Sequence, residues 1–205
     1  MGRLKILLAA LAAGIVAVPA SAEVTQTSPG HFVSRNTAST TADSTTVWRT
    51  LIEPAAWWED AHTWSGSAAN LSIAPQGGGC FCERLSAQER RLDGSVQHMT
   101  VVMAQPMKLL RMTGALGPLQ GEPVNGVLTV TIEPRESGGT ALVWEYAVAG
   151  HFRFPVDSLA RSVDAVMGVQ LGRLVAAANS EGEREEEGGD SGLASTRPLA
   201  DQGDP

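Results

Sequence analysis

The sequence is short of basic charge. Lys and Arg together number 15 against 22 Asp and Glu in 205 residues, which gives a formal net charge of −7 at pH 7. Proteins that bind nucleic acid need a basic surface to neutralise the phosphates. We therefore expect no nucleic-acid partner for this chain.

Familiar catalytic motifs are also missing from the sequence. It contains no Gly-rich phosphate loop, no serine-nucleophile elbow, no paired metal-binding His motif and no dinucleotide fingerprint. The four His residues are scattered, at positions 31, 62, 98 and 151. The sequence therefore predicts neither a cofactor nor a metal site.

No apolar run reaches the roughly 20 residues that a membrane-spanning helix needs. The longest, Ile6 to Val18, follows Arg3 and Lys5 and leads into Ala20-Ser21-Ala22. This pattern is typical of a secretory signal peptide. We expect residues 1–22 to be cleaved off after Ala22 and the mature protein to be secreted or periplasmic. Because no Cys follows directly after the cut, no membrane anchor is expected.

The C-terminal segment is acidic and poor in large apolar side chains. Residues 180–205 hold eight acidic residues against Arg184 and Arg197. Such a segment buries too little surface to offset the entropy lost on ordering. We interpret 180–205 as a disordered tail and 23–29 as an N-terminal linker, which leaves one folded domain over residues 30–179.

The central part of the chain shows patterns of strands and two short helices. A strand is expected over 31–41, followed by a short helix capped by Asp43 that ends before Pro54, and by a helical turn at Trp57 and Trp58. Further strands are expected over 69–74, 79–85, 95–104 and 107–113.

The clearest local signals come last in the chain. Segments 126–133 and 140–149 alternate apolar and polar residues around a Gly-rich loop, which predicts a hairpin. Its register sets Leu128, Val130 and Ile132 opposite Tyr146, Trp144 and Leu142. Apolar residues then recur with helical spacing over 156–179, which predicts a long amphipathic helix.

These elements predict an α+β fold in which a curved antiparallel sheet of six or seven strands wraps around the C-terminal helix. Segments 47–58 and 77–83, together with that helix, resemble the START-like (SRPBCC) superfamily and its helix-grip fold. Residues 110–120 are similar to a tract of secreted bacterial members with no assigned reaction. This branch is close to the activators of heat-shock-protein ATPase and the polyketide cyclases.

The resemblance implies a cavity between the sheet and the C-terminal helix that binds a small hydrophobic molecule, such as a lipid, a polyketide or an aromatic compound. The alternative is that the same side chains close into a solid core. The expected ligand-binding residues are the inward-facing ones of the strands and the helix: Phe81, Met99, Val101, Leu128, Val130, Leu142, Trp144, Tyr146, Val163 and Met167.

Two residues are candidates for catalysis, Glu83 and His98. Glu83 shares a strand face with Phe81, so burial in the cavity would raise its pKa and suit it to act as a general acid. An enzyme of the cyclase or aromatase type is therefore the alternative to a binding protein, and a co-chaperone-like interaction module ranks below both. Glu145 is expected to point outward, and Arg111 to pair with Glu83 or Glu145.

The only two Cys residues, Cys80 and Cys82, flank Phe81. On an extended strand their Cα atoms would lie about 6.6–6.8 Å apart, at the upper edge of disulfide geometry. Partly buried free thiols are therefore favoured over a redox role, although an oxidising destination leaves a bridge open. If residue 85 pairs with residue 95, Cys82 faces His98, and a Cys-His-Cys metal trio is a further, weaker alternative.

Overall fold

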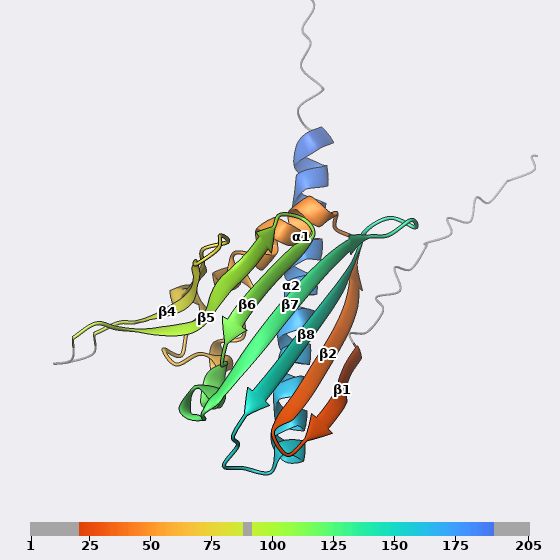
Figure 1. Ribbon diagram of the computed structural model, residues 1–205. Helices are drawn as coiled ribbons and strands as arrows, with labels where there is room; N and C mark the ends of the chain where they lie inside the picture. Colours follow the sequence, from red (N-terminus) through yellow and green to blue (C-terminus); the bar gives the residue numbers. More distant parts are fainter. Residues whose placement is uncertain (1–20, 88–91, 191–205) are drawn as a thin grey trace, which may run out of the picture.

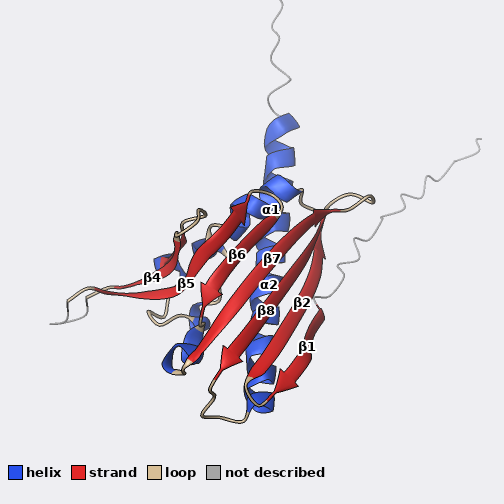
Figure 2. Ribbon diagram, in the orientation of Figure 1, coloured by secondary structure: helices blue, strands red, loops and turns tan. Residues whose placement is uncertain are grey.

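The computed structural model describes residues 21–87 and 92–190. Most of the expected signal peptide, residues 1–20, and the end of the acidic segment, residues 191–205, lie outside the described residues. Within these ranges the chain forms one antiparallel sheet and a long C-terminal helix, α2, Val156–Asp190, that lies across one face of the sheet (Figures 1 and 2). The expected α+β, helix-grip-like architecture is confirmed.

Eight strands follow one another across the sheet in the order β1-β2-β8-β7-β6-β5-β4-β3 (Figure 1). Every neighbouring pair with a described register is antiparallel. The strands are β1 Ser21–Ser28, β2 His31–Thr40, β3 Leu71–Ile73, β4 Cys80–Leu85, β5 Gly94–Gln105, β6 Leu109–Gly114, β7 Val124–Pro134 and β8 Thr140–Gly150.

β1 occupies the segment that we expected to be a linker, so the sheet has one strand more than the upper expectation. All its residues except Val24 are exposed. Its pairing with β2, from Ser21 opposite Thr37 to Ser28 opposite His31, depends on backbone hydrogen bonds. A strand without a buried face leaves no alternating apolar signal, which is why the linker interpretation was wrong.

The first helix, α1, Ser44–Leu51, begins after Asp43, as predicted. The Asp43 carboxylate accepts a hydrogen bond from the Thr46 N–H at 2.8 Å, and this bond lowers the pKa of Asp43. The helical turn expected at Trp57 and Trp58 lies just before them, as the 3-10 turn η1, Pro54–Ala56. Three further 3-10 turns are η2 Asp60–His62, η3 Ala68–Asn70 and η4 Gly117–Gly121.

The hairpin of β7 and β8 has the predicted register. Leu128 lies opposite Tyr146, Val130 opposite Trp144 and Ile132 opposite Leu142, and all six side chains are buried. One face of the hairpin is therefore the inner face of the sheet, as its alternation requires.

On the outer face of the sheet, one expectation holds and one fails. Glu145 points outward and pairs with Arg35 of β2 at 3.3 Å in an exposed position. Arg111 forms no ion pair with Glu83 or Glu145. It donates a hydrogen bond to the Thr129 hydroxyl at 3.0 Å, because Thr129 lies directly opposite on β7.

α2 continues to Asp190, past Asn179, where the amphipathic pattern ends. Residues 180–190 are thus helical, which corrects the expected disorder of that segment. Glu and Arg favour helix, and Glu185 accepts hydrogen bonds from the Thr46 hydroxyl at 2.9 Å and from Arg49 at 3.0 Å on α1. None of the helices in the described ranges is long and apolar enough to cross a membrane.

Candidate ligand pocket

A pocket of about 390 Å³ lies between the sheet, the first half of α2 and two loops. Phe81 of β4 and His98 of β5 form its sheet wall. The other lining residues come from the helix and the loops: Trp58, Ala61, His62, Thr63, Trp64, Leu116, Gly117, Pro118, Leu119, Leu159, Ser162, Val163, Val166 and Met167. A concave, mainly apolar lining with a few polar groups is the usual form of a small-molecule site.

Phe81 is at the centre of an aromatic wall. Its ring lies 5.3 Å from the Trp58 ring, edge to face, and 5.0 Å from the His98 ring. The Trp58 indole N–H donates to the His62 carbonyl at 3.1 Å. This bond connects the wall to the loop that carries His62.

His98 faces inward because β5 contains a β-bulge. Phe81 pairs with Met99, whereas the next residue, Cys82, pairs with Gln97, so His98 is the extra residue of β5. His98 and Met99 are consecutive yet both buried, which regular alternation does not allow. The expected register set residue 85 opposite residue 95, but Leu85 pairs with Gly94, so Cys82 faces Gln97 and not His98.

The Glu83 carboxylate is buried beside His98 and holds the loop that borders the pocket. It accepts hydrogen bonds from the Trp64 N–H at 3.1 Å and from the Ser65 N–H, and lies 2.9 Å from His98 Nε2. Burial alone would raise the pKa of Glu83, but the bonds from Ser65, Trp64 and His98 together outweigh it and lower the pKa. The expectation of a raised pKa was therefore wrong, and with it the reason given for a general-acid role.

His98 is held in one neutral tautomer. Burial is the main cause that lowers the pKa of His98, and the Glu83 carboxylate offsets it only in part. The ring is therefore neutral at pH 7. Because an ionised carboxylate can only accept, Nε2 carries the proton and Nδ1 has the lone pair.

A hydrogen bond from Gln170 orients the His62 ring, and here the bonded ring nitrogen is the acceptor. The buried Gln170 of α2 accepts from the Glu59 N–H at 3.0 Å through Oε1, so its Nε2 donates to His62 Nδ1 at 2.7 Å. A neutral His62 then carries its proton on Nε2. Two imidazole rings of opposite hydrogen-bonding character therefore line one pocket: His62 keeps a donor and His98 an acceptor.

Trp64 and Gln120 connect the two loops at the edge of the pocket. Trp64 Nε1 donates to Gln120 Oε1 at 3.2 Å, and Trp64 is 55% exposed although it lines the pocket. The second loop is supported from the core by Tyr146, whose hydroxyl accepts from the Leu116 N–H at 3.1 Å. Burial raises the pKa of Tyr146 to about 12, so this hydroxyl keeps its proton.

The structure brings four of the expected site residues to the pocket, namely Phe81, His98, Val163 and Met167. Glu83 lies next to them through its contact with His98. The others are buried in the core and are not part of the lining: Met99, Val101, Leu128, Val130, Leu142, Trp144 and Tyr146.

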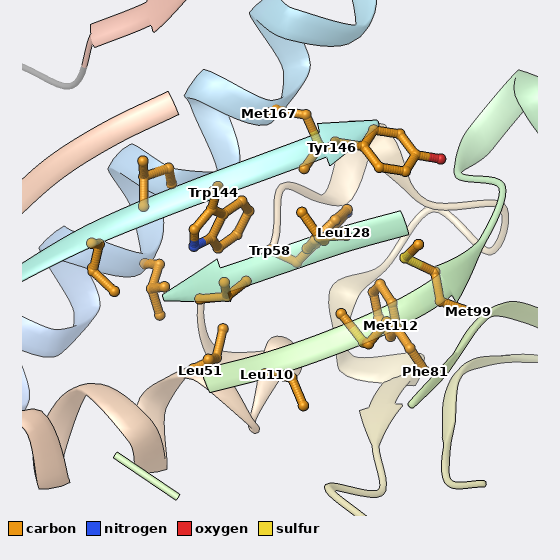
Figure 3. Packing of buried hydrophobic residues seen from close by; sticks show 14 of the residues in the cluster. Leu51, Trp58, Phe81, Met99, Leu110, Met112, Leu128, Trp144, Tyr146 and Met167 are labelled. Carbon is orange, nitrogen blue, oxygen red and sulfur yellow. The ribbon is translucent and has the colours of Figure 1, made fainter. Parts of the chain in front are cut away.

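The space over β7 and β8 is filled by side chains, which explains this difference. Trp57 meets the Trp144 ring nearly edge-on at 5.8 Å. Figure 3 shows Leu51 and Trp58 in the same packed cluster as Trp144 and Leu128. The cavity expected between the sheet and the helix is therefore confined to the space bounded by the two loops, and Trp144 does not line it.

The loop residues of the pocket were missed from the sequence. Trp64, His62 and Leu116 lie in segments without periodicity, so no pattern indicates which way they face. The tandem Trp57-Trp58 was the one available signal, because two consecutive large aromatics need apolar surroundings.

Cys80 and Cys82 form a disulfide, so the preference for free thiols was wrong. Their Cα atoms are 5.4 Å apart, within the usual range for a bridge. β4 is therefore shorter here than the regular strand assumed from the sequence. The bond also removes both sulfurs from a Cys-His-Cys metal trio, and residues 21–87 and 92–190 contain no cluster of three potential metal ligands.

The sequence matches no known family model and no curated protein. Solved structures share its fold. A Rhizobium leguminosarum protein of uncharacterised function aligns with a TM-score of 0.52 and 19% identity over 80% of this chain and 99% of its own. A protein from Rhodobacter sphaeroides aligns with a TM-score of 0.50 and 18% identity, over 78% of this chain and 99% of its own.

A third structure belongs to a protein with a named pathway. The di-domain ARO/CYC StfQ from the steffimycin biosynthetic pathway aligns with a TM-score of 0.53 and 9% identity, over 78% of this chain and 53% of StfQ. At such identities the likeness concerns the fold alone.

Proposed function

We propose that the protein binds a small, mainly apolar molecule in the pocket between α2 and the sheet, as a secreted or periplasmic member of the START-like superfamily. The observation that carries the proposal is the apolar pocket of about 390 Å³ beneath the Trp64 loop. This volume suits a ligand of two or three fused rings or a short acyl chain. The structural likeness to StfQ is consistent with an aromatic or polyketide-like ligand.

The two imidazole rings favour a ligand with polar groups at its ends. His62 presents a donor and His98 an acceptor, each fixed by a bond from its other ring nitrogen. A carbonyl oxygen complements the first and a hydroxyl the second. A hydroxylated aromatic ketone satisfies both while its rings contact Phe81 and Trp58.

The test is binding of a naphthalene-based fluorescent dye, for which we expect micromolar affinity, about −8 kcal/mol. Val166 lines the pocket from α2, so Val166→Trp should fill the pocket and abolish binding. Val169 lies on the same helix and is 45% exposed, so Val169→Trp is the matched control and should bind normally. Failure of the wild-type protein to bind any apolar probe would contradict the proposal.

A second candidate function is a cyclase- or aromatase-like reaction in the same pocket. The observation that favours it is the contact of His98 with Glu83, which orients the ring and leaves Nδ1 able to take a proton. Turnover of a polyketide-like substrate would then rise with pH through the lowered pKa of His98. It would be lost in His98→Gln while dye binding persists. Absence of turnover with intact binding favours the carrier.

A further inference from the structure

Cys80 and Cys82 lie on the face of β4 that points away from the pocket. They flank Phe81, which is buried and forms the centre of the pocket's aromatic wall. Both Cys residues are partly exposed, whereas Phe81 is 1% exposed. One short strand therefore carries an accessible disulfide on one face and a wall of the pocket on the other.

The disulfide also lies opposite the bulge that turns His98 inward. Cys80 pairs with Thr100 and Cys82 with Gln97, so a step of two residues on β4 faces a step of three on β5. The bonded Cys residues have their Cα atoms 5.4 Å apart, against about 6.6–6.8 Å in an extended strand. At this point β4 is shortened and the two strands are out of regular pairing, with His98 as the residue left over.

The bond contributes little to the stability of the whole domain. The stabilisation by a disulfide grows with the length of the loop it closes, and these Cys residues are two positions apart in the sequence. Its opening therefore does not require unfolding. A partly exposed disulfide is also open to exchange with thiols, whereas buried structural ones resist reduction.

We propose that the Cys80–Cys82 pair is a thiol–disulfide exchange site whose oxidation state sets the shape of the ligand pocket. The inference rests on the proposed function, since the property it controls is binding in that pocket. In the oxidised protein the bulge is held and His98 lies against Glu83 and Phe81. In the reduced protein β4 lengthens, regular pairing with β5 becomes accessible, and His98 leaves the wall.

The reductant is a dithiol, either a small molecule or a protein with two nearby Cys residues. One of its thiolates attacks a sulfur of the Cys80–Cys82 bond, which breaks, and the other Cys sulfur leaves as a thiolate and takes up a proton. The second thiol of the partner loses its proton and attacks the mixed disulfide, which releases the remaining Cys as a thiol. Two electrons and two protons pass to the protein, and the partner becomes a disulfide.

The experiment uses the full chain in buffers of reduced and oxidised dithiothreitol without denaturant. Thiol alkylation and mass spectrometry measure the oxidation state, and titration with the naphthalene dye measures pocket affinity. Hydrogen exchange of the amides of residues 95–100 reports on the bulge. We expect reduction without global unfolding, dye binding about tenfold weaker, and amide exchange at least about tenfold faster over this segment.

The double variant Cys80→Ser/Cys82→Ser provides the matched comparison. It should reproduce the affinity and the amide exchange of the reduced wild-type protein, and dithiothreitol should have no further effect on it. Two results would overturn the proposal: reduction that occurs only in denaturant, or equal affinity and equal exchange in the oxidised and reduced states.

The two proposals fail in different ways. If the dye binds neither state, ligand binding as proposed is wrong. Hydrogen exchange over residues 95–100 then still decides the redox inference, because it reports on the bulge without any ligand. A redox-dependent change supports control by the disulfide, and no change refutes it.

Discussion

The Glu83 carboxylate lies in largely apolar surroundings, where three hydrogen-bond donors stabilise its charge. They are the backbone N–H groups of Trp64 and Ser65 and the His98 ring. Glu83→Gln keeps the shape but turns an amide NH₂ toward at least one of these donors. A buried group left unsatisfied costs about 1–3 kcal/mol. We expect the free energy of unfolding in urea to fall by about 2 kcal/mol.

Glu145→Gln is the matched control for this prediction. Glu145 is exposed and pairs with Arg35 at 3.3 Å on the outer face of the sheet. Exposed ion pairs contribute about 0.2–1 kcal/mol. An equally large loss in Glu145→Gln would show that the buried hydrogen bonds of Glu83 are not what stabilises the loop.

The lowered pKa of His98 predicts that the protein becomes less stable as the pH falls below 7. Folding lowers its pKa, mainly through burial, so the unfolded state binds more protons below the ordinary value of about 6.5. The stabilisation is complete above that value and is lost as the pH falls through the folded pKa. We expect the free energy of unfolding to decrease between pH 7 and about 5.5, and to decrease less in His98→Gln.

Comparison of His98→Gln with the wild-type protein in the same urea titrations isolates the contribution of His98. A profile that is unchanged in His98→Gln would assign the pH dependence to other groups. The lowered pKa of Glu83 contributes separately, and its stabilisation is lost only in more acidic solution, below about pH 4.3.

At the scale of elements, Glu185 in the last turns of α2 forms hydrogen bonds to α1. Glu185 accepts hydrogen bonds from Thr46 and Arg49. We expect Glu185→Ala to lower the free energy of unfolding by about 0.5–1 kcal/mol and Tm by about 2–3 °C. Glu183→Ala changes an exposed residue of the same helix and should leave Tm unchanged in the same thermal scans. Equal Tm values for the two variants would refute this role of Glu185.

Elements with a buried face were predictable from the sequence, and those without one were not. β7 and β8 alternate so regularly that Leu128 opposite Tyr146 follows from the pattern. β1 has only Val24 partly buried, so its pairing with β2 leaves no trace in the order of residues. Residues 180–190 are helical because Glu185 contacts α1, a contact that the local composition does not contain.

The pocket was predictable in its walls but not in its extent. Phe81, Val163 and Met167 follow from strand alternation and helical spacing. The inward turn of His98 depends on a bulge, which arises from the mismatch of two strands rather than from either sequence alone. Trp57 fills the space over Trp144 from a different element, and a pattern along one segment cannot show this contact.

At the scale of the whole molecule, the proposed secretion determines where the mature chain begins. Cleavage after Ala22 would remove the positions of β1 opposite Thr37 and Asn36 and leave Glu23 as the first residue. We expect the intact mass of exported protein to correspond to a chain that starts at Glu23. A full-length chain retained in the membrane fraction would contradict the proposed secretion.

The order of the strands also determines when the molecule can assemble. β2 lies beside β8, and the facing residues Arg35 and Glu145 are 110 positions apart. A two-stranded hairpin is marginal alone, so β1 and β2 have no stable neighbour until most of the chain has left the ribosome. Pairings this distant fold slowly. The residues of β1 and β2 therefore remain unfolded during much of synthesis, and an unfolded segment can pass through a translocation channel.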